Sequence, residues 1–284
     1  KSIFPLFMVR YFKLLTTNDR INFYLGRISE KDFDIRHHQK GKRNYHGLLK
    51  IDDLGNCWMY EEPLKKLIIK TNNKNKYFKF SYGDITWISD PDVFVKNRKH
   101  DSLLKGEWNN GVILKCFNEK RHWGLCEKVR REDRRPFDQK KNMVFWRGTS
   151  TGYGMSGRKM TKDAYFAEFL KWKKIKPNRF HLVETWGKSK NKNIDVGFSF
   201  IHNEMRDNCP KWEIDHWEKY VKGWTEETFK GGERVSGFYP YKYLLSVEGN
   251  DKDSGLNWKL NSNSVVFMCK PRATSWLMEC TLIP

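Results

Sequence analysis

The stretch MVFWRGTSTGYGMSGR, from Met143 to Arg158, begins with apolar residues and continues into a loop of glycines and hydroxyl side chains. We predict a strand in its first part, because aromatic and β-branched residues form a short run that a glycine ends. The next segment, GRKMTKDAYFAEFLKWKK (157–174), carries apolar side chains at helical spacing. A strand, a loop and a helix in this order are typical of an α/β fold.

The second half of the chain repeats this pattern. We predict further strands in FHLVETW (180–186), YKYLLSVEGND (241–251) and NSVVFMC (263–269), and a helix in SGLNWKL (254–260). Strands that alternate with helices favour a parallel, Rossmann-like sheet. Ligands of such sheets bind at the carboxyl ends of the strands, where the glycine loops of this chain lie.

The first part of the chain is less regular. KYFKFSYGDITWI (76–88) is rich in β-forming residues with a Gly-Asp break, and GVILKCF (111–117) is a second apolar run. The charged stretch EKVRREDRRPFDQKK (127–141) is the best candidate for an interdomain connection. We therefore predict two domains, residues 1–135 and 136–284.

Composition restricts the class of protein. Hydrophobic residues make up 38% and aromatic residues 15% of the 284 residues, which is too much for a disordered chain. Lys and Arg number 54 against 34 acidic residues, a net charge of +20. The simplest interpretation is a solvated, lysine-rich surface. A nucleic acid, an anionic membrane surface and a phosphorylated small molecule are the other partners that such a charge attracts.

Neither a membrane span nor a zinc site is expected. SIFPLFMV (2–9) is apolar, but Arg10 and Lys13 interrupt it, and no other stretch approaches the roughly 18 apolar residues that a span requires. We expect a soluble protein, and the lack of a clear signal peptide favours the cytoplasm. The six cysteines form no C-x-x-C pair, so a zinc site of the usual spacing is not predicted.

Two glycine loops follow predicted strands: RGTSTGYG (147–154) and EGNDKDSG (248–255). Such loops present backbone N–H groups and a positive helix end to an anion, and Arg147 or Arg158 could add bidentate contacts to a phosphate. Neither loop matches the nucleoside-triphosphate or dinucleotide fingerprint. Two ordinary strand-to-helix turns are the alternative interpretation.

Several of these segments resemble glycosyltransferase family 90, which includes capsule-associated, lipopolysaccharide-modifying and protein O-glucosyltransferase enzymes. The most specific segment is YKYLLSVEGNDKDSGLNWKLNSNSVVFMCKPRATSWLMECTLIP (241–284), which looks like the closing signature of that family. VFWRG (144–148) and FSYGDITWISDPDVFVKNR (80–98) resemble two further family motifs in the same order. The resemblance covers residues 76–284.

The resemblance implies a GT-B architecture, with two Rossmann-like domains facing a central cleft. It implies an inverting enzyme that moves a sugar, usually glucose or xylose, from a UDP-sugar to a hydroxyl of a glycan or glycoprotein and forms a β-linkage. The acceptor would meet the first domain and the nucleotide-sugar the second, without a metal or another cofactor. The implied donor-binding residues are Arg147, Gly148, Thr149, Ser150, Thr151, Arg158, Glu248, Gly249, Asp251, Lys252, Asp253, Ser254 and Gly255.

Asp84 aligns with the catalytic base of the family, which takes the proton of the acceptor hydroxyl. Its alternative role is to cap a tight turn after Gly83. We interpret the D-x-D pair Asp90 and Asp92 as part of a turn around a proline and not as a metal site. One departure concerns the second loop, where Gly255 occupies a position at which animal family members have an arginine.

Two other functions stay open at this stage. The first is a basic protein that binds nucleic acid through surface cations and aromatic side chains, although the sequence contains no recognisable nucleic-acid motif and we expect no such partner. The second is a family member that binds a glycan without turnover.

Overall fold

The computed structural model describes residues 47–49, 70, 78–81, 94–99, 112–113, 123–152, 160–223, 235–269, 271–276 and 278. The chain divides into two compact units. One contains the described residues from Trp123 to Cys269, and the other contains those before Trp123 together with those from Pro271 onward. The division thus falls at Trp123 and not at the predicted boundary of 135/136. The functions assigned to the two domains stay predictions.

The charged stretch that we expected to connect the domains is folded into the first unit. It forms most of helix α4 (Leu125–Glu132) and the short helix η5 (Phe137–Gln139). Helix α4 buries Cys126 and Val129 in a core cluster of this unit. The expectation failed because the charges lie on one side of an amphipathic helix, a pattern that a count of charged residues does not reveal.

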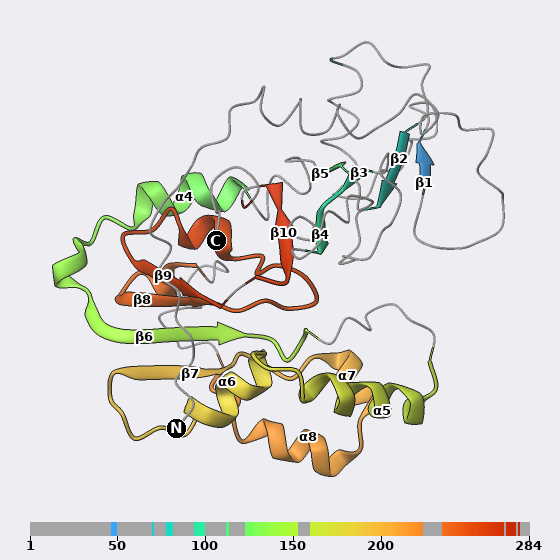
Figure 1. The fold of residues 1–284 in the computed structure, drawn as a ribbon. Coiled ribbons are helices and arrows are strands. Elements are labelled where there is room, and N and C mark those ends of the chain that lie inside the picture. Colours follow the sequence, from blue (N-terminus) through green and yellow to red (C-terminus); the bar gives the residue numbers. More distant parts are fainter. Residues whose placement is uncertain are drawn as a thin grey trace. The chain divides into compact units, whose positions relative to one another are not determined.

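The first unit contains a parallel sheet in the order β7-β6-β8-β9 (Figure 1). Its strands are β6 (Lys141–Gly148), β7 (Ile194–Phe198), β8 (Tyr241–Ser246) and β9 (Val265–Met268). All three pairings of neighbouring strands are parallel, with Phe145 opposite Asp195 between β6 and β7. The α/β class and the parallel sheet are therefore confirmed, and three of the four strands were predicted.

The predicted strand FHLVETW is wrong, because the segment forms helix α6 (Arg179–Trp186). The Asn178 side chain caps the helix by accepting a hydrogen bond from the His181 N–H at 2.8 Å. Phe180 and Val183 lie three residues apart and are both fully buried, as one helical face requires. The strand of the sheet comes later, at β7, which the sequence analysis missed.

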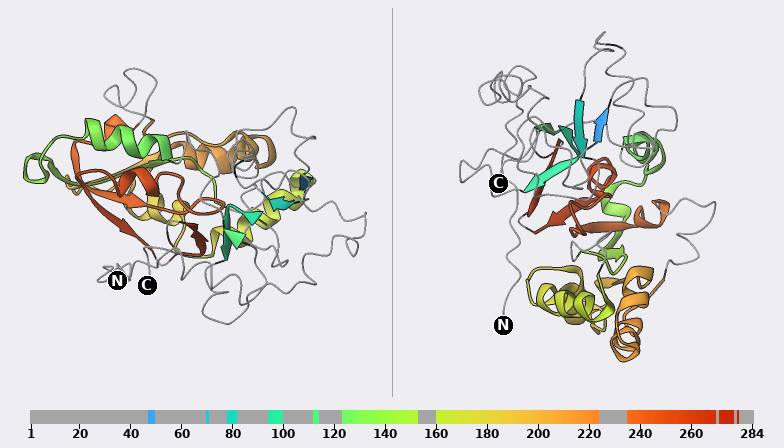
Figure 2. Two further views of the ribbon diagram at one scale, coloured as in Figure 1. Left: turned by 90° about the horizontal axis from the view of Figure 1, so that it is seen from above. Right: turned by 90° about the vertical axis from the view of Figure 1, so that its right-hand side faces the viewer.

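Helices cover both faces of this sheet, as Figures 1 and 2 show. Helices α5 (Lys162–Lys173), α6, α7 (Asn203–Asn208) and α8 (Lys211–Glu218) pack on one face. Helices α4, η6 (Ser236–Phe238) and α10 (Leu256–Lys259) pack on the other. Along β6, Trp146 belongs to the first core and Phe145 to the second, as the alternation of a strand requires. The helices at α5 and α10 confirm two predicted helices.

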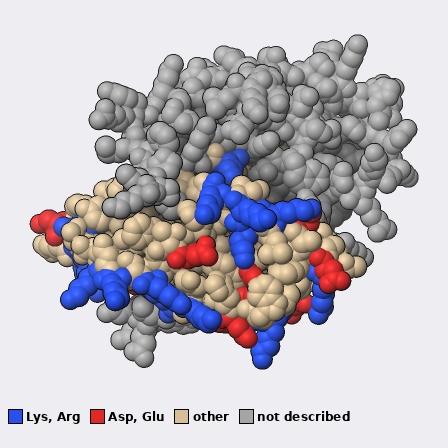
Figure 3. All heavy atoms as spheres, turned by 60° about the horizontal axis from the view of Figure 1, so that its bottom comes forward, with Lys and Arg blue, Asp and Glu red and all other residues tan. Residues whose placement is uncertain are grey.

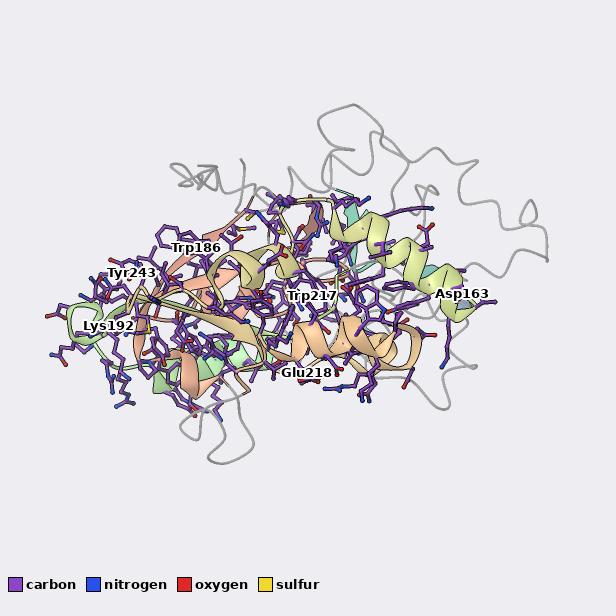
Figure 4. All side chains as sticks on the ribbon, turned by 90° about the horizontal axis from the view of Figure 1, so that it is seen from below. Asp163, Trp186, Lys192, Trp217, Glu218 and Tyr243 are labelled. Atoms are coloured by element: carbon purple, nitrogen blue, oxygen red, sulfur yellow. The ribbon has the colours of Figure 1, made fainter. Side chains whose placement is uncertain are left out.

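Aromatic side chains fill the larger core. Trp217 of α8 meets Phe180 of α6 edge to face, with 4.7 Å between ring centroids (Figure 4). A buried Glu213 ties the same helix to α5, because its carboxylate accepts from Lys173 at 2.7 Å and from the Trp217 indole at 2.6 Å. These contacts hold helices α5, α6 and α8 together in one layer.

The second unit contains short strands: β1 (Gly47–Leu49), β2 (Phe78–Ser81), β3 (Phe94–Val95), β4 (Asn97–Lys99), β5 (Val112–Ile113) and β10 (Ala273–Ser275). The order of one sheet is β1-β2-β3-β5, with the β2–β3 and β3–β5 pairs parallel. Strand β10 pairs with β4, so the last described strand joins this unit. Asp84 and the apolar segment 2–9 lie outside the described residues, and the GT-B architecture stays a prediction.

Within the described ranges, none of the helices has the length and apolar character that a membrane span would need.

Candidate functional site

The two glycine loops lie against each other at the carboxyl ends of β6 and β8, which are neighbours in the parallel sheet. The backbone N–H of Gly152, in the first loop, donates to the side-chain oxygen of Asn250, in the second, at 3.0 Å. The sheet thus brings together two segments that are about a hundred residues apart in sequence. Their place at the carboxyl edge is the one where ligands of such sheets bind.

Glycines allow the close contact of the two loops. Gly152 has a φ of 124°, a conformation that other residues rarely adopt. A β-carbon at this position would lie 3.2 Å from both the carbonyl oxygen of Gly249 and the Trp172 ring. A β-carbon on Gly249 would lie 3.0 Å from the guanidinium of Arg179. These two glycines are therefore required for packing, whether or not they approach a ligand.

Arg179, the first residue of α6, donates hydrogen bonds to both glycine loops. Its guanidinium donates to the Thr149 carbonyl at 3.0 Å and to the Thr151 hydroxyl at 2.9 Å in the first loop. In the second loop it donates to the carbonyl oxygens of Val247 and Glu248, each at 3.1 Å. The residue is 9% exposed. Sequence reasoning missed Arg179 because the segment was assigned to a strand; Asn178 as a helix cap is the signal that could have placed it.

Asp253 organises the second loop and is not turned toward a ligand. Its carboxylate accepts from Lys259 at 2.5 Å, from the Ser246 hydroxyl at 2.9 Å and from the Gly255 N–H at 2.9 Å. Burial alone would raise the pKa of Asp253, but the Lys259 ammonium, the Arg179 guanidinium and the Gly255 N–H together more than offset burial and hold the pKa below its ordinary value. Asp253 is therefore ionised and its oxygens are already used.

Gly255 sits in a crowded position. A β-carbon there would come within 3.2 Å of Asp253, Lys259 and the Trp258 indole nitrogen. An arginine at this position would require the ion pair between Asp253 and Lys259 to shift. The cation near this end of the loop is Lys259, which also donates to the Leu245 carbonyl at 2.9 Å.

Arg147 is held within the sheet. Its side chain is 2% exposed and forms two hydrogen bonds with the Asp195 carboxylate, at 2.8 and 2.9 Å. It also donates to the carbonyl of Gly223 at 3.2 Å. Burial would raise the pKa of Asp195, but Arg147 and Lys222 more than offset this effect and lower it. Arg147 would have to leave this carboxylate to bind a phosphate, so its predicted role stays a prediction.

The remaining predicted residues have separate environments. The buried Ser150 accepts from the N–H of His202, which ties the loop after β7 to the first glycine loop, at 2.9 Å. Lys252 is buried and donates to the Asn257 side chain at 3.3 Å. Gly148 packs against the Trp146 ring, where a β-carbon would come within 2.5 Å. The other members of the predicted set in the described part are Glu248 and Ser254, half-buried, and Asp251, buried.

Arg158, Asp84, Asp90 and Asp92 lie outside the described residues. Within the described ranges no group of three His, Cys, Asp or Glu side chains could hold a metal ion. Because the D-x-D pair lies outside those ranges, metal independence stays a prediction.

The loops have the chemistry of an anion site. In the part of the chain that the structure describes, the backbone N–H groups of Ser150 and Thr151 donate to no protein acceptor. Ser150 is fully buried and Thr151 is half-buried, so the Thr151 N–H is the better candidate for contact with a ligand. The cations Arg179, Lys252 and Lys259 are close to the same loops. Oriented N–H groups backed by buried cations favour a phosphate or diphosphate.

No protein-family model matches the chain. The sequence is similar to the O-glucosyltransferase LpsA of Dichelobacter nodosus, with 28% identity over 202 residues. The match covers 71% of this chain and 46% of that protein, so the chain spans about half the length of the curated relative that it matches. The similarity supports a relationship to a glycosyltransferase.

Proposed function

We propose that the chain is a glycosyltransferase that uses a UDP-sugar and transfers glucose or xylose to a hydroxyl of a glycan or glycoprotein. The observation that carries this proposal is the junction of two glycine loops at the carboxyl edge of adjacent parallel strands, with Arg179 behind them. The similarity to an O-glucosyltransferase supports the reaction class. The resemblance to glycosyltransferase family 90 supports the UDP donor and the β-linkage.

The diphosphate of the donor would lie against the first loop, where the N–H group of the half-buried Thr151 can donate to its oxygens. The leaving UDP gains negative charge as the bond between the anomeric carbon of the sugar and the diphosphate oxygen breaks. Fixed N–H dipoles and nearby cations stabilise that charge without reorganisation. Arg147 is left out of these contacts, because Asp195 already occupies its guanidinium.

Inversion requires a base on the face of the sugar opposite the diphosphate. The base takes the proton of the acceptor hydroxyl while its oxygen attacks the anomeric carbon, whose transition state resembles an oxocarbenium ion. Asp84 is the residue that the family resemblance assigns to this role. We propose that no metal is needed, since protein donors meet the charge of the diphosphate.

The charges on the described part of one face give no specific support to a second function. On the face that Figure 3 shows, Lys and Arg side chains occur in several places with Asp and Glu side chains between them. A continuous basic track along one face is the footprint expected of a nucleic-acid-binding protein. The donor site, in contrast, has a defined geometry.

A donor screen tests the proposal. Each common UDP-sugar is incubated with the protein, with and without EDTA, and released UDP is measured together with UDP binding by calorimetry. We expect binding of UDP, and turnover with UDP-glucose or UDP-xylose that EDTA does not change. No UDP binding, together with tight and salt-sensitive binding of an oligonucleotide, would favour the nucleic-acid interpretation.

The substitution Asp84→Asn tests the proposed base. It keeps the shape of the side chain and removes the proton acceptor, so kcat should fall by about 100- to 10,000-fold while UDP affinity and the melting temperature hardly change. The matched control is Asp163→Asn, at the exposed start of α5 (Figure 4), which should leave kcat unchanged. Near-wild-type turnover of Asp84→Asn would show a turn-capping role instead, because Asn is itself a good turn residue.

A further inference from the structure

We propose that Arg179 is a positioning residue for the donor site: its hydrogen bonds fix the backbone of both glycine loops against each other, and it does not touch the diphosphate itself. This inference rests on the proposed function. It concerns a residue that the sequence analysis did not select.

The orientation follows from the planarity of the peptide bond. In a trans peptide the C=O and the following N–H point in opposite directions. Arg179 binds the Thr149 carbonyl at 3.0 Å, so the N–H of Ser150 points away from the guanidinium. It binds the Val247 carbonyl at 3.1 Å, so the N–H of Glu248 also points away. One side chain thus sets peptide directions in both loops.

The geometry also explains why the residue is an arginine. The guanidinium is a planar fork with several donors, and here its three nitrogens reach the Thr149 carbonyl, the Thr151 hydroxyl and two carbonyls of the second loop. A lysine ammonium is a single point and cannot span these acceptors. The positive charge of Arg179 also acts on the buried Asp253 carboxylate of the second loop, whose pKa it helps to lower.

The substitution Arg179→Lys separates positioning from charge. It keeps the cation and loses the fork, so we expect the Kd for UDP, measured by calorimetry, to rise at least tenfold. The matched control is Arg206→Lys, at an exposed ion pair with Glu218 on α7 and α8, which should leave the Kd unchanged. A lysine variant that binds UDP as tightly as the wild type would overturn the positioning role.

Chemical rescue provides a readout that a general loss of stability would not move. Arg179→Ala should regain UDP affinity when guanidinium chloride is added at a concentration far below denaturing, and should not regain it with sodium chloride of equal ionic strength. Guanidinium can fill the space of the missing group and bond the same oxygens. Equal behaviour in the two salts would contradict the inference.

Hydrogen exchange separates this inference from the proposed function. In Arg179→Lys without ligand, the amides of Gly152 and Gly249, which donate to the Asn250 side chain and the Asp251 carbonyl, should exchange faster together, while the amides of β6 and β8 keep their wild-type rates. If wild-type protein binds no UDP, the proposed function fails, and the exchange result still decides whether Arg179 fixes the loops. Unchanged exchange in both loops would contradict the inference, whether or not the wild-type protein binds UDP.

A milder variant covers the case in which Arg179 variants do not fold. Thr151→Val removes one acceptor of the guanidinium at nearly constant volume. The Thr151 hydroxyl also shares a hydrogen bond with the Thr149 hydroxyl at 3.1 Å, so the variant loses two bonds of typical strength (about 0.5–1.5 kcal/mol each). We expect at least a twofold rise in the Kd for UDP and faster exchange of the Gly152 amide. Wild-type affinity and exchange would contradict the inference.

Discussion

The first unit contains two buried arginines in contrasting surroundings. Arg147 lies on β6 and pairs with the Asp195 carboxylate, while Arg179 begins α6 and donates to uncharged oxygens of two loops. A guanidinium beside a carboxylate is neutralised and holds strands together. A guanidinium bonded to several carbonyls fixes the direction of those peptide groups, and Arg179 also helps to lower the pKa of the buried Asp253. Arg147 thus joins two strands, while Arg179 joins two loops.

Sequence reasoning selected Arg147 because it is the first residue of the first glycine loop and belongs to the VFWRG segment that resembles a family motif. In the strand, however, its side chain points to the face that also contains Phe145, whose ring lies 4.7 Å from the guanidinium. Asp195 lies opposite Phe145 in the adjacent strand β7, and its carboxylate accepts two hydrogen bonds from the Arg147 guanidinium.

The substitution Arg147→Met should produce the largest change in stability. It leaves Asp195 beside Lys222 alone, and breaking a buried ion pair costs about 3–5 kcal/mol. Because Asp195 is 25% exposed and keeps one cation, we expect about 2–3 kcal/mol in urea unfolding. In the folded variant the Kd for UDP should stay within twofold of wild type.

The opposite result would break the comparison. A loss of about 1.5–3 kcal/mol in UDP affinity at unchanged stability is what a charge-assisted bond to phosphate predicts. In that case Arg147 would leave Asp195 to bind the donor, as the sequence analysis expected.

The substitution Gly152→Ala tests the loop junction with an intermediate effect. A residue other than glycine at a φ of 124° costs about 1–3 kcal/mol, and the β-carbon would press on Gly249 and Trp172. We expect both lower stability and weaker UDP binding. The matched control is Gly223→Ala, which has a positive φ of 63° and open space around its β-carbon. It should lose stability alone, and equal loss of UDP affinity in both variants would argue against the junction as the donor site.

The sequence predicted the parts of the fold that depend on local pattern. The strands at β6, β8 and β9 and the helix at α5 were found because apolar periodicity and glycine ends mark them. Helix α6 was missed because Phe180, Leu182 and Val183 are all buried, so the segment reads as an apolar run without clear periodicity. Strand β7 has Asp195 as its second residue and Gly197 as its fourth, and both lower its strand signal.

The candidate site was predictable only in part, and for a related reason. The two glycine loops are visible in sequence, since each follows a strand. That they meet depends on β6 and β8 being neighbours, a fact of sheet order. Arg179 enters from a third element, 30 residues from Thr149 and 68 residues from Val247. Contacts between distant segments have no signature in one sequence.

The smallest predicted effect concerns Lys222, the outer partner of Asp195. The ammonium is 33% exposed and lies 2.9 Å from the carboxylate, so Lys222→Met should cost only about 0.5–1 kcal/mol at pH 7. Lys222 helps to lower the pKa of Asp195, and its removal should move that pKa back toward the ordinary value of 3.8.

The sign of the pH dependence sharpens this prediction. A carboxyl whose pKa is lowered by folding stabilises the fold above its ordinary pKa, and the contribution disappears as pH falls through the lowered value. The stability gap between wild type and Lys222→Met should therefore be full at pH 7 and should close below about pH 3.8. Urea unfolding at pH 7 and at acid pH measures the gap, with the exposed Lys190→Met as control. A gap that stays constant with pH would show that Lys222 acts through its aliphatic contacts with Gly197, and that Arg147 alone sets the ionisation of Asp195.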